Sequence, residues 1–160
     1  MAALFEKRNP AVDIRLAATW TRADQTYTPK GHWFGKPVSA MADDLRAAAE
    51  QARAANPAVR GILPVGEAWN RAMATGVADP DPYDGIAYGQ LDLWTYDHYH
   101  ASVAGYYLSA LVTFGAITGV DPVSLGAKEK SADALGLSDA QAAALQAVAR
   151  HEPARSTPPR

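Results

Sequence analysis

The sequence contains no cysteine, and it has only four histidines among its 160 residues. The absence of cysteine excludes disulfide bonds, thiolate metal sites and cysteine nucleophiles, and it leaves the redox compartment undecided. Half of the histidines, His98 and His100, lie in one short stretch together with an aspartate and a serine. That stretch is the first place to look for chemistry.

An excess of positive charge and a long hydrophobic run are also missing. The chain has 15 basic and 17 acidic side chains, a formal net charge of -2, and no basic stripe, so we expect no nucleic-acid partner. The longest apolar stretch, residues 106–120, is interrupted by polar residues and glycines and falls short of the roughly 20 residues of a membrane span. The N-terminus does not resemble a secretory signal, so the cytoplasm is the default location unless a missing N-terminal segment carries a signal.

What is present fits a globular domain. Hydrophobic residues make up 48% and charged residues 20% of the chain, which is typical of folded rather than disordered proteins. We expect one domain over residues 1–150 and a disordered, proline-containing tail over residues 151–160. The first eight residues resemble the last two turns of a helix whose beginning is absent.

The hydrophobic pattern predicts strands that alternate with helices. The expected elements are a strand at 12–16, a helix from about 37 to 55, a strand at 59–64, a helix from 66 to 76, a long loop at 77–96, a helix at 102–119 and a last helix from 138. This order indicates an α/β fold with a parallel sheet. Two strands are few for such a sheet, which indicates part of a fold from which N-terminal strands are missing.

The stretch around residues 97–102 allows three interpretations. Asp97 and His100 have the spacing of a carboxylate that orients a catalytic base, with a helix starting directly behind them. The spacing also fits an aspartate-capped turn with a hydrogen-bonded imidazole. A metal site would combine Asp97, His98 and His100, with Asp92 or Glu67 as a further ligand.

The flanking residues favour the catalytic interpretation. Asp97-His98-Tyr99-His100-Ala101-Ser102, followed by Gly105-Tyr106-Tyr107-Leu108, resembles the C-terminal catalytic block of SGNH/GDSL hydrolases. Thr19-Trp20 and Pro64-Val65-Gly66-Glu67-Ala68-Trp69 resemble segments of bacterial members of that family, so the resemblance covers residues 9–126. It implies part of a flavodoxin-like three-layer α/β/α fold that acts on ester bonds.

The resemblance assigns roles residue by residue. Asp97 would orient the base and His100 would be the base, with no cofactor and no metal. Trp20, Glu67 and Trp69 are the candidate substrate-binding residues for a small acyl ester. Their alternative roles are burial for the tryptophans, and for Glu67 a charge that complements a helix dipole.

The family's nucleophile and oxyanion hole have no counterpart in this sequence, which contains neither Gly-Asp-Ser nor Gly-x-Asn-Asp. None of the seven serines follows a predicted strand at a sharp glycine turn. They are Ser39, Ser102, Ser109, Ser124, Ser131, Ser138 and Ser156. We therefore expect a hydrolase half that is inactive alone, with a complementing N-terminal segment or a second copy of the chain as its partner. The alternative is a non-catalytic α/β remnant or self-associating interaction module.

Overall fold

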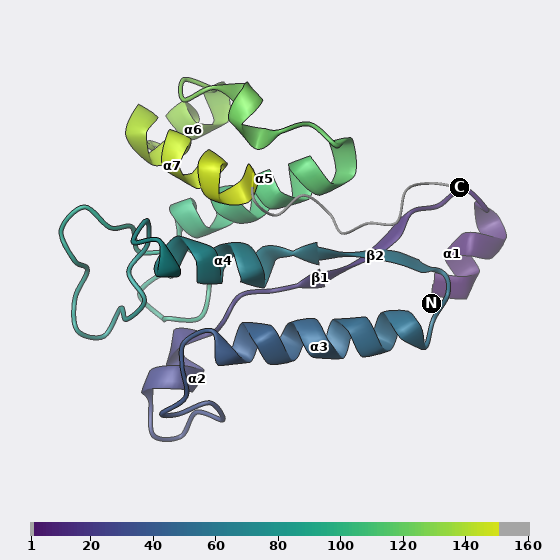
Figure 1. Cartoon of the computed structure of the whole chain (residues 1–160), viewed down its shortest axis with the longest axis horizontal. Helices are drawn as coiled ribbons and strands as arrows, with labels where there is room; N and C mark the ends of the chain where they lie inside the picture. The colour runs from purple at the N-terminus through teal and green to yellow at the C-terminus, as the bar shows by residue number, and fades with distance from the viewer. Residues whose placement is uncertain (1, 151–160) are drawn as a thin grey trace.

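A computed structural model describes residues 2–150, which form a mixed α/β fold (Figure 1). The predicted tail at 151–160 lies outside the described residues. The strands are β1 (Ile14–Ala18) and β2 (Val59–Pro64). The helices are α1 (Ala2–Arg8), α2 (Ala23–Tyr27), α3 (Ala40–Ala54), α4 (Val65–Ala74), α5 (Val103–Thr118), α6 (Lys130–Ala134) and α7 (Asp139–Arg150), and the 3-10 helix η1 spans Pro122–Leu125.

The two strands pair in parallel, as the alternation of strand and helix predicts. The register runs from Ile14 opposite Val59 to Ala18 opposite Pro64, with a shift after Ile14. Parallel neighbours require a crossover connection, and α3 provides it. Within residues 2–150 the sheet has no third strand, so β1 and β2 each pair on one side only.

Helices pack on both sides of the strand pair. In Figure 1, α3 runs along one side, whereas α5 and α7 lie on the other, and α4 continues directly from the end of β2. The core between α4, α5 and α7 includes Trp69, Trp94, Leu108 and Leu145, each at most 1% exposed. None of the described helices has the length and apolar character needed to cross a membrane.

The boundaries of α5 follow from local chemistry. The Ser102 hydroxyl accepts a hydrogen bond from the amide of Gly105, which is the N-cap that the sequence predicts. Gly119 ends the helix in a left-handed conformation with φ 70°, where a side chain would be strained. Leu108 and Leu111 are buried, whereas Phe114 lies on the half-exposed face of the helix.

Two short helices were not expected from the sequence. α2 and α6 have five residues each, too few for an apolar stripe to recur. Contacts formed in the folded chain stabilise them: Glu129 caps α6 with its carboxylate, and the first turn of α2 is held by the loop that carries Asp97 and His100. β1 also begins two residues later than predicted.

Candidate functional site

Asp97 and His100 lie at the tip of a tight hairpin. Trp94 pairs with Ala101 in an antiparallel bridge. One residue closer to the tip of the hairpin, the amide of Thr95 donates to the carbonyl of His100 at 2.8 Å. The chain reverses at His98, whose φ of 55° is the one positive value at a non-glycine position in the described part of the chain. A non-glycine residue held in this region marks a turn that the surrounding contacts impose.

The Asp97 carboxylate collects four hydrogen bonds. Its Oδ1 accepts from the Thr95 hydroxyl at 2.7 Å and from the amides of Tyr99 and His100 at 3.0 and 2.9 Å. Its Oδ2 lies 2.6 Å from Nδ1 of His100. The bond from Thr95, followed by those from the imidazole and the amides, holds the pKa of the Asp97 carboxyl below its usual range. The carboxylate is therefore ionised and fixed in direction.

This contact sets the tautomer and orientation of His100. An ionised carboxylate only accepts hydrogen bonds, so the Nδ1 atom that faces Asp97 is the one that carries the proton. The Nε2 atom is left as the acceptor, and the His100 side chain is 58% exposed. An exposed imidazole with a proton-accepting Nε2 and a carboxylate behind Nδ1 has the arrangement of a general base.

Contacts from distant residues hold the hairpin at the carboxyl end of β1. The indole of Trp20, two residues after β1, donates to the Tyr99 carbonyl at 3.1 Å. The indole of Trp94 donates to the Thr21 carbonyl at 2.8 Å, and the amide at the start of α2 donates to the His98 carbonyl at 3.2 Å. Open α/β sheets place their sites at this edge. Asp97 and His100 therefore lie near the edge where such sites are usually found.

Tryptophan side chains pack beside the Asp97–His100 pair, which is called the dyad from here on. Trp20 stacks on Trp69 with ring centroids 4.9 Å apart and meets the edge of Tyr106 at 6.0 Å. Trp69 is fully buried and touches Trp94 behind it. Of the two predicted substrate-binding tryptophans, Trp20 is thus the partly exposed one, and Trp69 supports it from the core.

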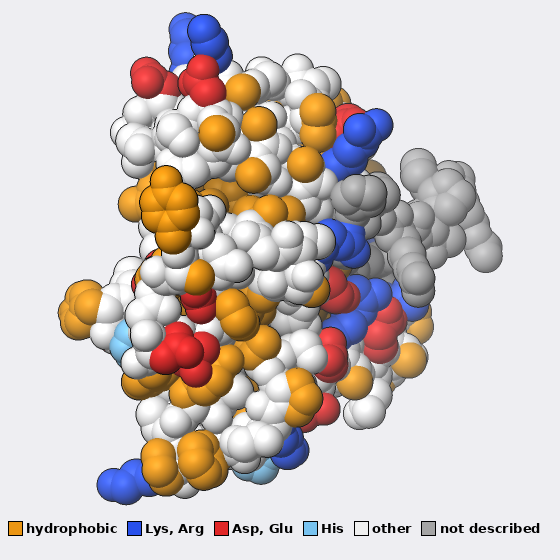
Figure 2. Space-filling model, turned by 60° about the vertical axis from the view of Figure 1, so that its left-hand side comes forward, with side chains coloured by type: hydrophobic (Ala, Val, Ile, Leu, Met, Phe, Trp, Pro, Cys, Tyr) orange, Lys and Arg blue, Asp and Glu red, His pale blue; other side chains and the backbone are white. Residues whose placement is uncertain are grey.

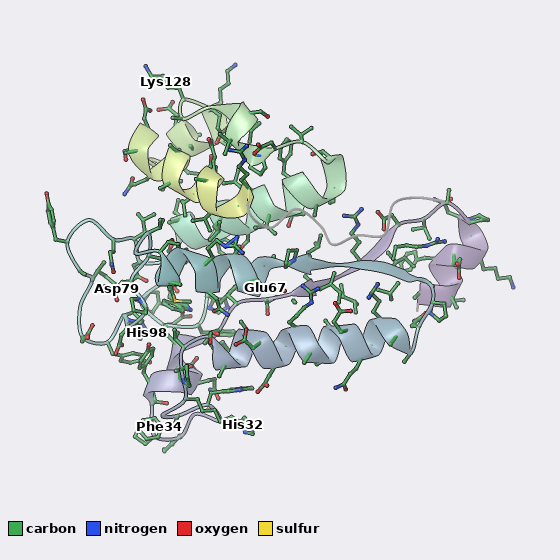
Figure 3. The ribbon with its side chains drawn as sticks, in the orientation of Figure 1. His32, Phe34, Glu67, Asp79, His98 and Lys128 are labelled. Atoms are coloured by element: carbon green, nitrogen blue, oxygen red, sulfur yellow. The ribbon has the colours of Figure 1, made fainter. Side chains whose placement is uncertain are left out.

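The third candidate, Glu67, lies apart from the dyad. Its carboxylate is bound by the guanidinium of Arg46, which also pairs with Glu50 on the same helix, α3. Figure 3 shows Glu67 beside α3, whereas His98 lies at the loop end of the molecule near Asp79. The structure brings Trp20, Asp97 and His100 together and leaves Glu67 in an ion-pair network between helices.

The structure does not bring the residues of the alternative metal site together around a common point. The His98 ring packs on Tyr83 with centroids 4.2 Å apart, whereas the His100 ring packs on Tyr99. Among residues 2–150 no group of three or more histidine or acidic side chains is placed to hold a metal ion. Figure 2 views the loop end of the molecule, where hydrophobic side chains surround small groups of carboxylates and a histidine.

Sequence reasoning missed Tyr99 and Thr95, which contact His100 and Asp97, and Arg22, which contacts Tyr99. Tyr99 packs against the His100 ring at 4.3 Å, and the guanidinium of Arg22 lies 3.9 Å from the centre of the Tyr99 ring. Asp24 holds Arg22 by two hydrogen bonds of 3.0 and 2.7 Å. Thr95 lies two residues before Asp97 and can be found as a local partner, whereas Arg22 and Tyr99 are far apart in the sequence and meet only in the fold.

The serines of the described chain have structural roles at several positions. Ser102, although two residues from His100, donates to the Asp92 carbonyl at 2.7 Å and caps α5. Ser109 donates to the Gly105 carbonyl, and Ser124 donates to the Asp121 carbonyl. Each of these hydroxyls donates its proton to a backbone carbonyl, so none of the three is directed at His100.

Comparison of the chain with protein-family models, with curated proteins and with solved structures finds no match.

We expect the hydrogen bonds to Asp97 to make stability depend on pH. The folded chain lowers the pKa of this carboxyl below its unfolded value of about 3.9. The stabilisation is therefore complete above that value and is lost as the pH falls through the folded pKa. Urea unfolding at a series of pH values should show that Asp97→Asn flattens the loss of stability below about pH 4.

The matched control is Asp84→Asn, which removes the same charge at an exposed turn. It should keep the acid slope of the parent chain. Equal slopes for the parent and Asp97→Asn would show that folding does not lower the pKa of the Asp97 carboxyl.

Proposed function

We propose that this chain carries the base and orienting carboxylate of an SGNH/GDSL-type serine hydrolase that acts on ester bonds. The observation that carries the proposal is the 2.6 Å contact between Asp97 Oδ2 and His100 Nδ1 on a hairpin beside the end of β1. The His100 side chain is 58% exposed, as a base that has to reach a substrate requires. The proposed fold is the C-terminal part of a three-layer α/β/α domain.

In the proposed reaction, Nε2 of His100 takes the proton of a serine hydroxyl as that oxygen attacks the ester carbonyl. The imidazolium that forms is stabilised by Asp97, and it then gives the proton to the departing alcohol. Water repeats the sequence to release the acid and restore the serine. Trp20 provides an apolar surface beside the base, suited to the acyl part of a small ester.

The serine and the oxyanion-hole donors have to come from a complementing segment. The sequence has no Gly-Asp-Ser motif, and the hydroxyl nearest to His100 along the chain, that of Ser102, is bound to the Asp92 carbonyl. The reaction requires a nucleophile, a group that transfers the proton and donors that stabilise the oxyanion. In this proposal the chain supplies the group that transfers the proton.

The second candidate function is a non-catalytic α/β module that associates with itself. The observation that favours it is the structural use of Ser102, Ser109 and Ser124 in backbone hydrogen bonds. A stable chain that stays inert with every complementing segment would support this function over the first.

We expect the chain alone to show no esterase turnover above background on short p-nitrophenyl esters, because the nucleophile and the oxyanion hole are lacking. It should also resist labelling by serine-directed phosphonates. Mixing or fusing it with an N-terminal SGNH segment that bears Gly-Asp-Ser should produce turnover. If the chain alone hydrolyses esters, and mutating one of its own seven serines abolishes that activity, a complete local site exists and the half-site proposal is wrong.

A further inference from the structure

The hydrogen bonds to the Asp97 carboxylate come from both arms of the hairpin. Three of them are donated by the arm after the turn, from the amides of Tyr99 and His100 and from Nδ1 of His100. The fourth comes from the arm before the turn, where the Thr95 hydroxyl donates to Oδ1 at 2.7 Å. Within residues 2–150, Thr95 is thus the one donor that holds this carboxylate from the opposite arm.

A donor on the opposite arm restricts a motion that the other donors leave open. The terminal torsion of an aspartate side chain is broad, so a carboxylate bound from one side can still tilt about its Cβ–Cγ bond. Both amides bind Oδ1, and such a tilt moves Oδ2 relative to Nδ1 of His100. A third donor on Oδ1 that approaches from the other arm fixes the carboxylate plane and leaves Oδ2 directed at the imidazole.

The Thr95 hydroxyl has one proton and two acceptors within reach. The His100 carbonyl lies 3.3 Å from Oγ1 of Thr95, whereas Asp97 Oδ1 lies at 2.7 Å. A hydrogen bond to an ionised acceptor is the stronger one, and the His100 carbonyl already accepts from the Thr95 amide at 2.8 Å. The hydroxyl proton therefore goes to Asp97.

The backbone of Thr95 is itself held in place. Its amide donates to the His100 carbonyl, and its carbonyl accepts from the His98 amide at 2.9 Å. The preceding residue, Trp94, is 1% exposed, and its indole donates to the Thr21 carbonyl, which ties this arm to the segment after β1. A hydroxyl on a backbone fixed in this way can set the direction of the carboxylate that it binds.

We propose that Thr95 is a positioning residue, whose hydroxyl holds Oδ2 of Asp97 against Nδ1 of His100. It thereby keeps the imidazole in the tautomer and orientation in which Nε2 accepts a proton. Thr95 acts only through Asp97 and exchanges no proton with a substrate. The contact exists in the isolated chain, whereas its effect on turnover rests on the proposed hydrolase function.

The tautomer of His100 can be measured in the isolated chain by ¹⁵N NMR of its imidazole at about pH 8.5, where an ordinary imidazole is neutral. The signals are assigned by their loss in His100→Ala. We expect mainly the Nδ1–H form in the parent chain. Thr95→Ala should raise the ratio of the Nε2–H form to the Nδ1–H form at least about twofold, the lower end of what one hydrogen bond contributes.

Thr95→Ser is the matched partner of Thr95→Ala, because the two variants differ only in the hydroxyl, and it should keep the parent ratio within about twofold. The control for a lost hydroxyl elsewhere is Thr113→Ala. Thr113 is half-buried in the middle of α5 and donates to the Ser109 carbonyl at 2.8 Å. This variant should leave the tautomer ratio of His100 unchanged.

In the complemented enzyme, Thr95→Ala should lower kcat about tenfold or more and change KM less than about twofold, because the base is misplaced while the Trp20 surface is intact. Thr95→Ser should restore kcat, and Thr113→Ala should not alter it. A merely structural role would lower the amount of folded protein, measured by circular dichroism, and would leave the kcat of the folded fraction unchanged.

Three results would overturn the inference. They are a parent chain whose His100 is mainly in the Nε2–H form, a folded Thr95→Ala chain with the parent tautomer ratio, and a Thr95→Ala enzyme with the parent kcat. The first of these needs no variant to fold. If no complementing segment produces turnover, the hydrolase function fails, and the tautomer ratio still decides whether Thr95 positions Asp97.

Discussion

Replacing His100 by alanine should lower the turnover of the complemented enzyme by at least about 10³-fold, the usual loss when a triad member is removed. The physical reason is that alanine removes the nitrogen that takes the serine proton in the proposed reaction. Asp97→Asn should cost about 10²–10⁴-fold, since the amide can present its NH₂ to His100 and favour the wrong tautomer. Initial rates on p-nitrophenyl acetate measure both losses.

The matched control is His32→Ala. His32 is an exposed loop histidine whose ring packs against Trp33, and Figure 3 shows it beyond α3, away from His98. This variant should keep the parent rate within about twofold. Equal rates for His100→Ala and the parent would remove His100 from the mechanism and overturn the proposed role of the Asp97–His100 pair.

Replacing Trp69 by alanine should lower the free energy of unfolding by about 3–5 kcal/mol. The side chain is fully buried, stacks on Trp20 at 4.9 Å and touches Trp94, and its indole donates to the Ser109 hydroxyl at 3.2 Å. Truncation would leave a cavity under the Trp20 ring, beside Asp97 and His100. Urea unfolding at one fixed protein concentration measures the change, because self-association would otherwise shift it.

Phe34→Ala is the control for this loss. Phe34 is 53% exposed on the loop after α2, so its removal should change the free energy of unfolding by less than about 0.5 kcal/mol. A Trp69→Ala chain as stable as the Phe34→Ala chain would mean that the tryptophan cluster does not hold the α4–α5 core together.

The sequence by itself determined the features that depend on neighbours a few residues apart. Asp97 accepts from the amides of Tyr99 and His100 and contacts the imidazole of His100, so this contact can be predicted from the spacing of the two residues. Ser102 caps α5 through a bond three residues long, and β2 was predicted with its observed bounds because its apolar run ends at a proline. Local hydrogen bonds and periodicity decide such features, and both are visible in a sequence.

Only the tertiary structure decided which distant side chains meet. Trp20 donates to the Tyr99 carbonyl across 79 positions, and Trp94 reaches Thr21 across 73. Trp69 packs under the Trp20 ring, whereas Glu67 pairs with Arg46, because helix α4 directs these two side chains to different sides. Which face of α5 the rest of the chain covers was equally hidden, since a helix without charged side chains does not reveal it. These outcomes depend on packing between segments, which no local pattern encodes.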